Sequence, residues 1–178
     1  MGLMQTNRYA PSLVLLHWLM FLLFAIALAA IEYRGFVPKT DPSRPFITMI
    51  HMTAGVLVLI LACVRVAVRF TRPAPRPVPG PLWQIGAARL LYLLMYVVMF
   101  ALPLAGIYFV QAGGRDVAFF GTTLPHFFAA NPDLRGPVKD FHEFVGNAVY
   151  YIVGLHILAA LFHQFVLKDG IMSRMRMR

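Results

Sequence analysis

Four histidines that lie in apolar segments are the residues of this chain best suited to chemistry. His142 and His156 stand fourteen residues apart in one segment, close to four helical turns, so their imidazoles lie on nearly the same helix face. A rise of about 1.5 Å per residue separates them by roughly 21 Å, and this places one near each surface of a hydrocarbon core about 30 Å thick. His17 and His51 occupy matching depths in two other apolar segments. The spacing predicts an inner pair, His17 with His156, and an outer pair, His51 with His142.

Two histidines that face each other at one depth can hold a haem iron from both sides. We therefore predict two haems b, one at each depth, with these four histidines as the metal ligands. No C-x-x-C-H motif occurs, so each haem would be held without thioether links. Two pairs about four turns apart cannot form one zinc site, and no nearby carboxylate suits a di-iron site. A single buried histidine is more often a packing residue, but four that match by depth favour ligation.

Small and cationic residues near the histidines are candidates for binding the same cofactors. Gly55 and Gly146 each follow a predicted ligand by four residues, about one helical turn, where the missing side chain leaves room for a flat macrocycle. Arg65 and Arg69 lie near the depth of the inner pair, and a guanidinium group suits a haem propionate. These four residues complete the predicted cofactor-binding set around the histidines.

The composition excludes an ordinary soluble domain. Of the 178 residues, 60% are hydrophobic and 13% are charged, whereas about 25% of residues are charged in soluble domains. The mean hydropathy is +0.70. The one cysteine, Cys63, excludes a disulfide within the chain and a thiolate metal cluster. We therefore expect the lipid bilayer to be the surroundings of this protein.

Four long apolar stretches predict four membrane-spanning helices, at about residues 13–31, 47–70, 82–110 and 141–167. We interpret residues 1–178 as a single domain with an all-α fold, a four-transmembrane-helix bundle. The first stretch has the length of a span rather than of a signal-peptide core, and it carries His17 and Trp18. Pro103 is expected to kink the third helix.

The basic residues predict the orientation. With four spans both termini lie on one side of the membrane, and the whole formal net charge of +9 falls on that side. The charges on the outer side, in residues 32–46 and 111–143, cancel. Both termini are therefore expected in the cytoplasm, and the basic tail is interpreted as a topology signal beside anionic lipid rather than as a nucleic-acid site. The longer outer loop is a candidate cap over a site.

Seven motifs spread over nearly the whole chain share their order and spacing with one known family. They are Leu16-His17-Trp18-Leu19, Tyr33-Arg34-Gly35-Phe36-Val37-Pro38, Ile50-His51-Met52-Thr53-Ala54-Gly55, Ala101-Leu102-Pro103-Leu104-Ala105-Gly106, Phe141-His142-Glu143, Gly154-Leu155-His156 and Lys168-Asp169. These motifs resemble bacterial cytochrome b561. The resemblance implies the same ligand pairing and a multi-pass protein of the bacterial inner membrane. The chain departs from the family near the start of the third helix, where Arg89 and Tyr92 stand and the family has a histidine.

Within that family the chain looks most similar to the di-haem superoxide oxidases. The resemblance implies that electrons pass from periplasmic superoxide through two haems b to ubiquinone, with no obligatory protein partner. Four cations close to the outer pair are candidates for attracting the superoxide anion: Arg34, Lys39, Arg44 and Lys139. On the inner side, His163 and Trp18 are candidates for contact with ubiquinone, and Arg89 and Gln164 are candidates for the walls of its site.

Two other functions stay open at this point. The chain could be a haem b subunit that couples quinone to a partner hydrogenase or dehydrogenase, and an iron–sulfur protein would then co-purify with it. It could also be a small transporter or membrane anchor whose histidines only pack, and the purified protein would then be colourless.

Overall fold

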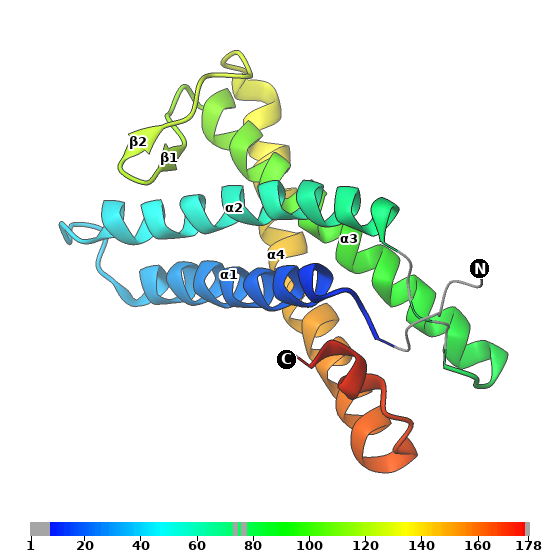
Figure 1. The fold of residues 1–178 in the computed structure, drawn as a ribbon. Coiled ribbons are helices and arrows are strands. Elements are labelled where there is room, and N and C mark those ends of the chain that lie inside the picture. Colours follow the sequence, from blue (N-terminus) through cyan, green and yellow to red (C-terminus); the bar gives the residue numbers. More distant parts are fainter. Residues whose placement is uncertain (1–7, 73–74, 76–77, 177–178) are drawn as a thin grey trace.

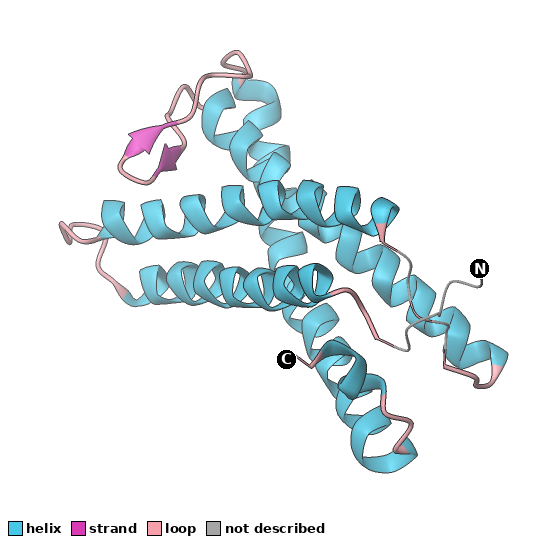
Figure 2. Cartoon of the chain, in the orientation of Figure 1, coloured by secondary structure: helices cyan, strands magenta, loops and turns pink. Residues whose placement is uncertain are grey.

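The computed structural model describes residues 8–72, 75 and 78–176. Most of this part of the chain is helical (Figure 2). The long helices are α1 (Pro11–Phe36), α2 (Arg44–Thr71), α3 (Leu82–Ala112) and α4 (Pro132–Phe162), and each is long and apolar enough to cross a membrane. The four predicted spans are therefore confirmed as helices, and the chain is a multi-pass membrane protein. Two of the basic residues behind the predicted orientation, Arg76 and Arg178, lie outside the described residues.

The fourth helix begins earlier than the sequence analysis predicted, at Pro132 instead of near residue 141. Asn131 caps it, because its side-chain oxygen accepts a hydrogen bond from the Leu134 amide at 3.2 Å. Pro132 then occupies the first turn, where its missing N–H costs nothing. The polar first turns were assigned to a loop because the prediction followed hydrophobicity, whereas the cap decides where the helix begins.

The prediction of an all-α fold was wrong in one detail. A short hairpin of β1 (Ala118–Phe119) and β2 (Thr122–Thr123) stands in the loop between α3 and α4. Phe120 and Gly121 link the strands with φ angles of 50° and 80°, as a tight hairpin turn requires. Strands of two residues are too short to give a recognisable alternation in the sequence.

The helices form two antiparallel pairs, α1 with α2 and α3 with α4, and Figure 1 shows the first pair lying across the second. Buried Met20, Val58, Ala62 and Met99 join α1, α2 and α3 in one apolar cluster. On α4, by contrast, the one fully buried side chain among those described is Val149. Helix α4 therefore packs on α3 and leaves most of its surface for other contacts.

The outer loop is held in place by one side chain at the end of α3. Gln111 is fully buried, and its amide nitrogen donates to the Pro125 carbonyl at 2.7 Å. Its amide oxygen accepts from the amides of Phe127 and Phe128 at 2.9 and 3.3 Å. The Phe120 amide also donates to the Thr53 hydroxyl of α2 at 3.2 Å. These bonds fold the loop back over α2.

The two ends of the described chain meet at one end of the molecule. After α4 the chain continues through a π-helix, η1 (His163–Leu167), and a 3-10 helix, η2 (Ile171–Met175). The Tyr9 amide donates to the Arg174 carbonyl at 3.3 Å, and the Trp18 indole donates to the Met175 carbonyl at 3.1 Å. This closure agrees with an even number of spans and with termini on one side of the membrane.

Candidate functional site

The structure brings the predicted outer pair together. The ring centres of His51 on α2 and His142 on α4 are 6.2 Å apart. His51 Nδ1 donates to the Ala27 carbonyl at 2.8 Å, and His142 Nδ1 donates to the Leu102 carbonyl at 2.9 Å. Because a carbonyl only accepts, both Nδ1 atoms carry the proton. The lone pair of each imidazole is therefore on Nε2, which is the state needed to ligate a metal.

Gly106 of α3 makes room for one of these rings. A Cβ atom at that position would stand 3.0 Å from His142 Cε1, closer than side chains normally pack. A glycine therefore lets the imidazole lie directly against the α3 backbone. The ring also has an edge contact with Phe109, with centres 5.3 Å apart. The orientation of His142 is thus determined by α3 on two sides.

The inner pair is also brought together. The ring centres of His17 on α1 and His156 on α4 are 6.1 Å apart. Arg65 of α2 donates to the Leu13 carbonyl, one turn before His17, at 3.1 Å. Its charge therefore lies beside this pair, as the sequence analysis predicted. Arg69 lies farther along α2, and its guanidinium contacts the Arg72 carbonyl at the helix end at 3.5 Å.

The distances fit one haem iron between the rings of each pair. An imidazole nitrogen bound to a metal of this row lies about 2.0–2.1 Å from it, and the ring centre lies about 1.1 Å farther back, so two rings on opposite sides would have centres about 6 Å apart. The observed separations of 6.2 and 6.1 Å agree with this. A Cβ atom at Gly55 or Gly146 would meet nothing within 4 Å, so there is open space beside the outer ligands. The donor sets suit haem at both pairs, and the open space suits it at the outer pair.

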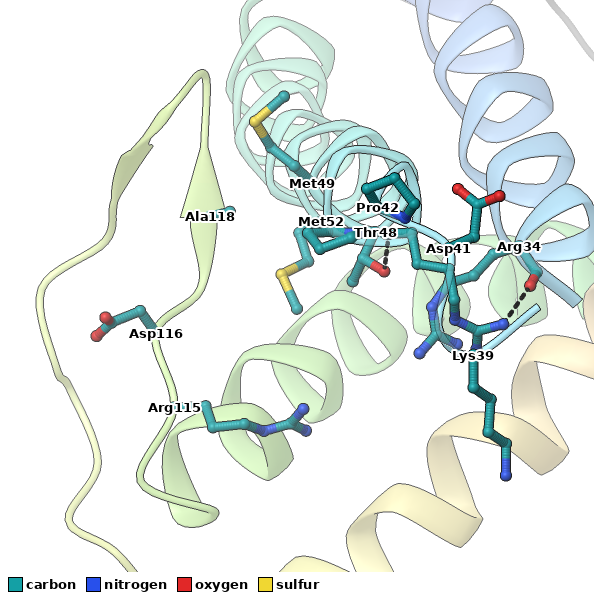
Figure 3. Close-up of a pocket in the computed structure, with 12 residues that line it drawn as sticks. Arg34, Lys39, Asp41, Pro42, Thr48, Met49, Met52, Arg115, Asp116 and Ala118 are labelled. Carbon is teal, nitrogen blue, oxygen red and sulfur yellow. Dashed lines mark hydrogen bonds between the residues drawn. The ribbon is translucent and has the colours of Figure 1, made fainter. Parts of the chain in front are cut away.

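A cationic pocket of about 410 Å³ lies next to the outer pair (Figure 3). Its charged lining consists of Arg34, Lys39, Arg44, Arg115, Asp41 and Asp116. Met52, the neighbour of His51 in the chain, forms part of the apolar wall. Three of the four cations predicted to attract an anion therefore share one pocket, and the outer loop contributes Arg115, which was not predicted.

Two of the pocket's charged groups are engaged in local structure. Arg44 donates to the Arg34 carbonyl at 3.0 Å and to the Val37 carbonyl, and so closes the C-terminal end of α1. Asp41 accepts hydrogen bonds from the Ser43 hydroxyl at 2.6 Å and from the Ser43 amide at 2.8 Å. These two bonds hold the pKa of the Asp41 carboxyl below its ordinary value. The pocket therefore keeps an excess of positive charge that one ionised acid reduces.

Lys139, the fourth predicted cation, does not line the pocket. It pairs with Glu143 one turn along α4, with Nζ and Oε1 2.8 Å apart. His126 also lies at the outer end, and its Nε2 is 2.8 Å from Asp116 Oδ1. Exposed pairs of this kind contribute little to stability.

The inner end of α4 carries a histidine–carboxylate pair. His163 Nδ1 donates to Asp169 Oδ2 at 2.5 Å, and both side chains are mostly buried. Burial raises the pKa of Asp169, but the hydrogen bonds from His163 and from the Ile171 amide, with the charge of Arg174, bring that pKa below its ordinary value. A second pocket, of about 330 Å³, is lined by Gln164, Phe165, Lys168 and Gly170. Of the predicted quinone contacts, Gln164 lines this pocket, and Trp18 is bonded to the C-terminal segment instead.

The chain matches the family described as prokaryotic cytochrome b561 over residues 8–177. It belongs to the prokaryotic cytochrome b561 family. The probable superoxide oxidase CybB of Yersinia pestis is 37% identical over 170 residues, which is 95% of this chain and 96% of that protein. Cytochrome b561 homolog 1 of Escherichia coli is 34% identical over 174 residues, 97% and 98% of the two chains. Cytochrome b562 of Cereibacter sphaeroides is 33% identical over 128 residues, 71% of this chain and 65% of that protein.

Membership of the cytochrome b561 family makes this chain an electron-transfer membrane protein, and the family implies that it binds haem b. The resemblance recognised in the sequence motifs is thereby confirmed. Two residues that serve the site of this cytochrome were not among the predicted site residues. Gly106 was visible only as the end of a motif, and Gln111 as a polar residue at the end of a span. Their contacts are with segments far away in the sequence, so no local pattern could indicate their roles.

Proposed function

We propose that this cytochrome is a di-haem b oxidoreductase that takes electrons from periplasmic superoxide and passes them to ubiquinone. The observation that carries the proposal is the presence of two histidine pairs, with ring centres 6.2 and 6.1 Å apart, on the helices of one small protein. The name of the Yersinia pestis relative, a probable superoxide oxidase, supports the choice of reaction.

In this proposal His51 and His142 ligate one haem, and His17 and His156 ligate the other. Each haem supplies a centre that accepts and releases one electron at a time. The carbonyls of Ala27 and Leu102 keep the outer imidazoles in the ligating tautomer and orientation. Gly55 and Gly146 leave space beside the outer ligands, and Arg65 offers a cation beside the inner pair. Arg69 is the more distant candidate for a propionate on that side.

The chain's role at the outer end is to attract a small anion. The cations Arg34, Lys39, Arg44 and Arg115 give the pocket beside the outer pair a positive potential, which raises the encounter rate with superoxide, most strongly at low salt. Arg44 is occupied by carbonyl groups of the α1 end, so Lys39 is the cation best able to meet the anion. Lys139 contributes less, because Glu143 pairs with it.

The chain's role at the inner end is to supply protons to the quinone. Two superoxide anions give up one electron each and leave as two O₂ molecules, and ubiquinone takes those two electrons with two protons to become ubiquinol. His163 can donate a proton from its ring, and the Asp169 carboxylate orients that ring by accepting a hydrogen bond from Nδ1. The pocket that Gln164 lines lies next to this pair in the chain and could admit the quinone headgroup.

The location follows from the same proposal. Both termini lie in the cytoplasm, and the protein is a multi-pass protein of the bacterial inner membrane that works without an obligatory protein partner. The charge asymmetry along the chain and the meeting of the two chain ends support this arrangement. The test is to add a protease or a thiol reagent to the periplasmic side of the inner membrane. A tag at either terminus should react only after that membrane has been permeabilised.

The test is stopped-flow spectroscopy on the oxidised protein in detergent. Superoxide is added, and the reduced haem band is followed with and without ubiquinone. Reduction by superoxide followed by reoxidation only when quinone is present is the expected result. Haems that ignore superoxide but are reduced by ubiquinol would contradict the proposal and favour an electron carrier that serves a partner dehydrogenase or hydrogenase.

A further inference from the structure

Two arginines at the outer end, Arg34 on α1 and Arg135 on α4, hold buried donors that lack an acceptor. The Nε atom of each is buried and has no hydrogen-bond partner in the part of the chain that the structure describes. A buried donor without an acceptor is costly, and more so in a charged group. Both guanidinium groups can therefore accommodate a further hydrogen-bond acceptor. A carboxylate is the acceptor whose geometry and charge fit a guanidinium best.

Arg135 lies in the same groove of the α3–α4 pair as His142. The His142 ring packs where a Cβ of Gly106 would stand, and Arg135 packs where a Cβ of Gly113 would stand, 2.5 Å from its Nε. Arg135 precedes His142 by seven residues, and Gly113 follows Gly106 by seven. Because the two helices are antiparallel, the two side chains enter one groove about two turns apart. Gly106 of α3 makes room for a ligand histidine, and Gly113, the residue that follows α3, makes room for an arginine.

Arg34 stands in the matching position on α1. The Ala27 carbonyl holds the His51 ring, and Arg34 follows Ala27 by seven residues, about two turns toward the outer surface. Arg34 also lines the cationic pocket beside the outer pair. Each half of the outer pair therefore has an arginine with an unpaired donor two turns farther out, one on α1 and one on α4.

We propose that Arg34 and Arg135 form a clamp that binds the two propionate carboxylates of the haem at the outer pair. This inference rests on the proposed function, because it needs a haem between His51 and His142. A haem held there has two carboxylates, and two guanidinium groups with buried, unpaired Nε atoms would neutralise them. The clamp also gives the cations of the pocket different roles. A propionate neutralises Arg34, whereas Lys39 and Arg115 remain to attract superoxide.

The experiment uses the full-length protein in detergent with the variants Arg34→Gln and Arg135→Gln. The first measurement is the rate at which each haem passes to an excess of apomyoglobin, and the second is the midpoint potential of each haem in a redox titration. Each variant is expected to lose one haem about tenfold faster, as losing a charge-assisted hydrogen bond implies. The midpoint potential of that haem should fall, because a positive charge beside it favours the reduced form. The other haem should keep its rate and its potential.

Two kinds of control make the result specific. Arg115→Gln removes another cation of the same pocket. Arg115 has no buried, unpaired donor, so this variant should leave the haem transfer rates unchanged. Arg34→Lys and Arg135→Lys keep the charge, and should restore most of the potential while leaving the transfer rate between those of the wild type and the Gln variants. The Lys variants carry the test if a Gln variant does not fold.

The failure of the clamp can be told apart from the failure of the proposed function. Wild-type transfer rates and potentials in both Gln variants, in a protein that holds two haems, would overturn the clamp alone. Full haem content in His51→Ala would remove the haem from the outer pair, and the clamp would fall with it.

Discussion

The outer and inner histidine pairs are built at the same ring separation but are supported in different ways. Both imidazoles of the outer pair donate to backbone carbonyls, of Ala27 and of Leu102. In the part of the chain that the structure describes, the inner rings have no such bond, and their neighbours are the Trp18 ring and the Arg65 guanidinium. The outer pair is therefore oriented by hydrogen bonds to the backbone, whereas the inner pair lies among side chains that are themselves bonded to the backbone.

The two ends of the molecule also differ in their net charge. The outer end has cations and acids that cancel overall but gather in one pocket, and the inner end carries the net positive charge of the chain. In the proposed function the outer site takes electrons from a small anion, which its cationic pocket suits. The inner site, beside η1, η2 and a histidine–carboxylate pair, would then pass them to a larger apolar molecule that needs protons. Under that proposal, equal ring separations serve two different exchanges of electrons.

The largest expected effect comes from removing a ligand. His51→Ala and His156→Ala should each lose one haem and keep the other, because each pair ligates its haem separately. Haem per protein, measured as the pyridine haemochrome, should fall by half in each variant. His126→Ala, which removes an exposed partner of Asp116, serves as the control and should keep both haems. Unchanged haem content in both ligand variants would break the comparison altogether.

A bulkier residue at Gly106 should weaken only the outer site. In Gly106→Ala the new Cβ would stand 3.0 Å from His142 Cε1, so the ring must shift and the outer haem should bind less tightly. Gly86→Ala is the matched control on the same helix, since a Cβ there would meet nothing within 4 Å. A faster loss of one haem in the first variant, and none in the second, is expected in the apomyoglobin assay. Equal rates of haem loss in the two variants would show that the contact between Gly106 and His142 does not limit haem binding at the outer pair.

The outer loop should loosen when its buried amide is removed. Gln111→Leu abolishes three hydrogen bonds, to the Pro125 carbonyl and from the Phe127 and Phe128 amides. A net loss of about 0.5–1.5 kcal/mol for each hydrogen bond is expected, less where water replaces the lost partner. Hydrogen exchange of the loop amides should therefore become faster while the helices keep their protection. Gln84→Leu, near the inner end of α3, is the control, and loop exchange at the wild-type rate would contradict the role given to Gln111.

A smaller effect is expected from Lys39, one of the cations of the pocket. Lys39→Gln should slow haem reduction by superoxide a few-fold at low salt, and the difference should shrink as ionic strength rises, because attraction at a distance is screened. Lys168→Gln at the inner end should not change this rate. The measurement is the stopped-flow rate at several salt concentrations. A loss in Lys39→Gln that does not depend on salt would indicate a local structural change instead of attraction.

The smallest effect concerns pH at the inner end. The pKa of Asp169 lies below its ordinary value, so its bonds to His163 and to the Ile171 amide stabilise the fold above the unfolded pKa, about 3.9. That contribution is lost only as pH falls through the lower folded value. The difference in melting temperature between the wild type and Asp169→Asn should therefore be present at pH 5 and should disappear in strong acid, below about pH 3.9. A difference that persisted unchanged in strong acid would contradict an ionised Asp169.

Much of this site could be predicted from the sequence because helices make depth a linear function of residue number. The spacing of His142 and His156 predicts both their common face and their separation, and the structure brings each next to its expected partner. The existence of the four spans follows from hydrophobicity in the same way. Boundaries were less accurate, since Asn131 and Pro132 begin α4 through a cap that hydrophobicity does not detect.

What the sequence by itself determined is the set of apolar spans, the pairing of histidines by depth and the uneven distribution of charge along the chain. Only the tertiary structure decided which side chains contact across helices: Gly106 beneath His142, Gln111 within its loop, and Lys139 with Glu143 away from the pocket. The physical reason is that periodicity along one helix is local, whereas packing between helices depends on rotation and approach. The rotation of each helix and its distance from its neighbours cannot be predicted from the residues of one segment alone.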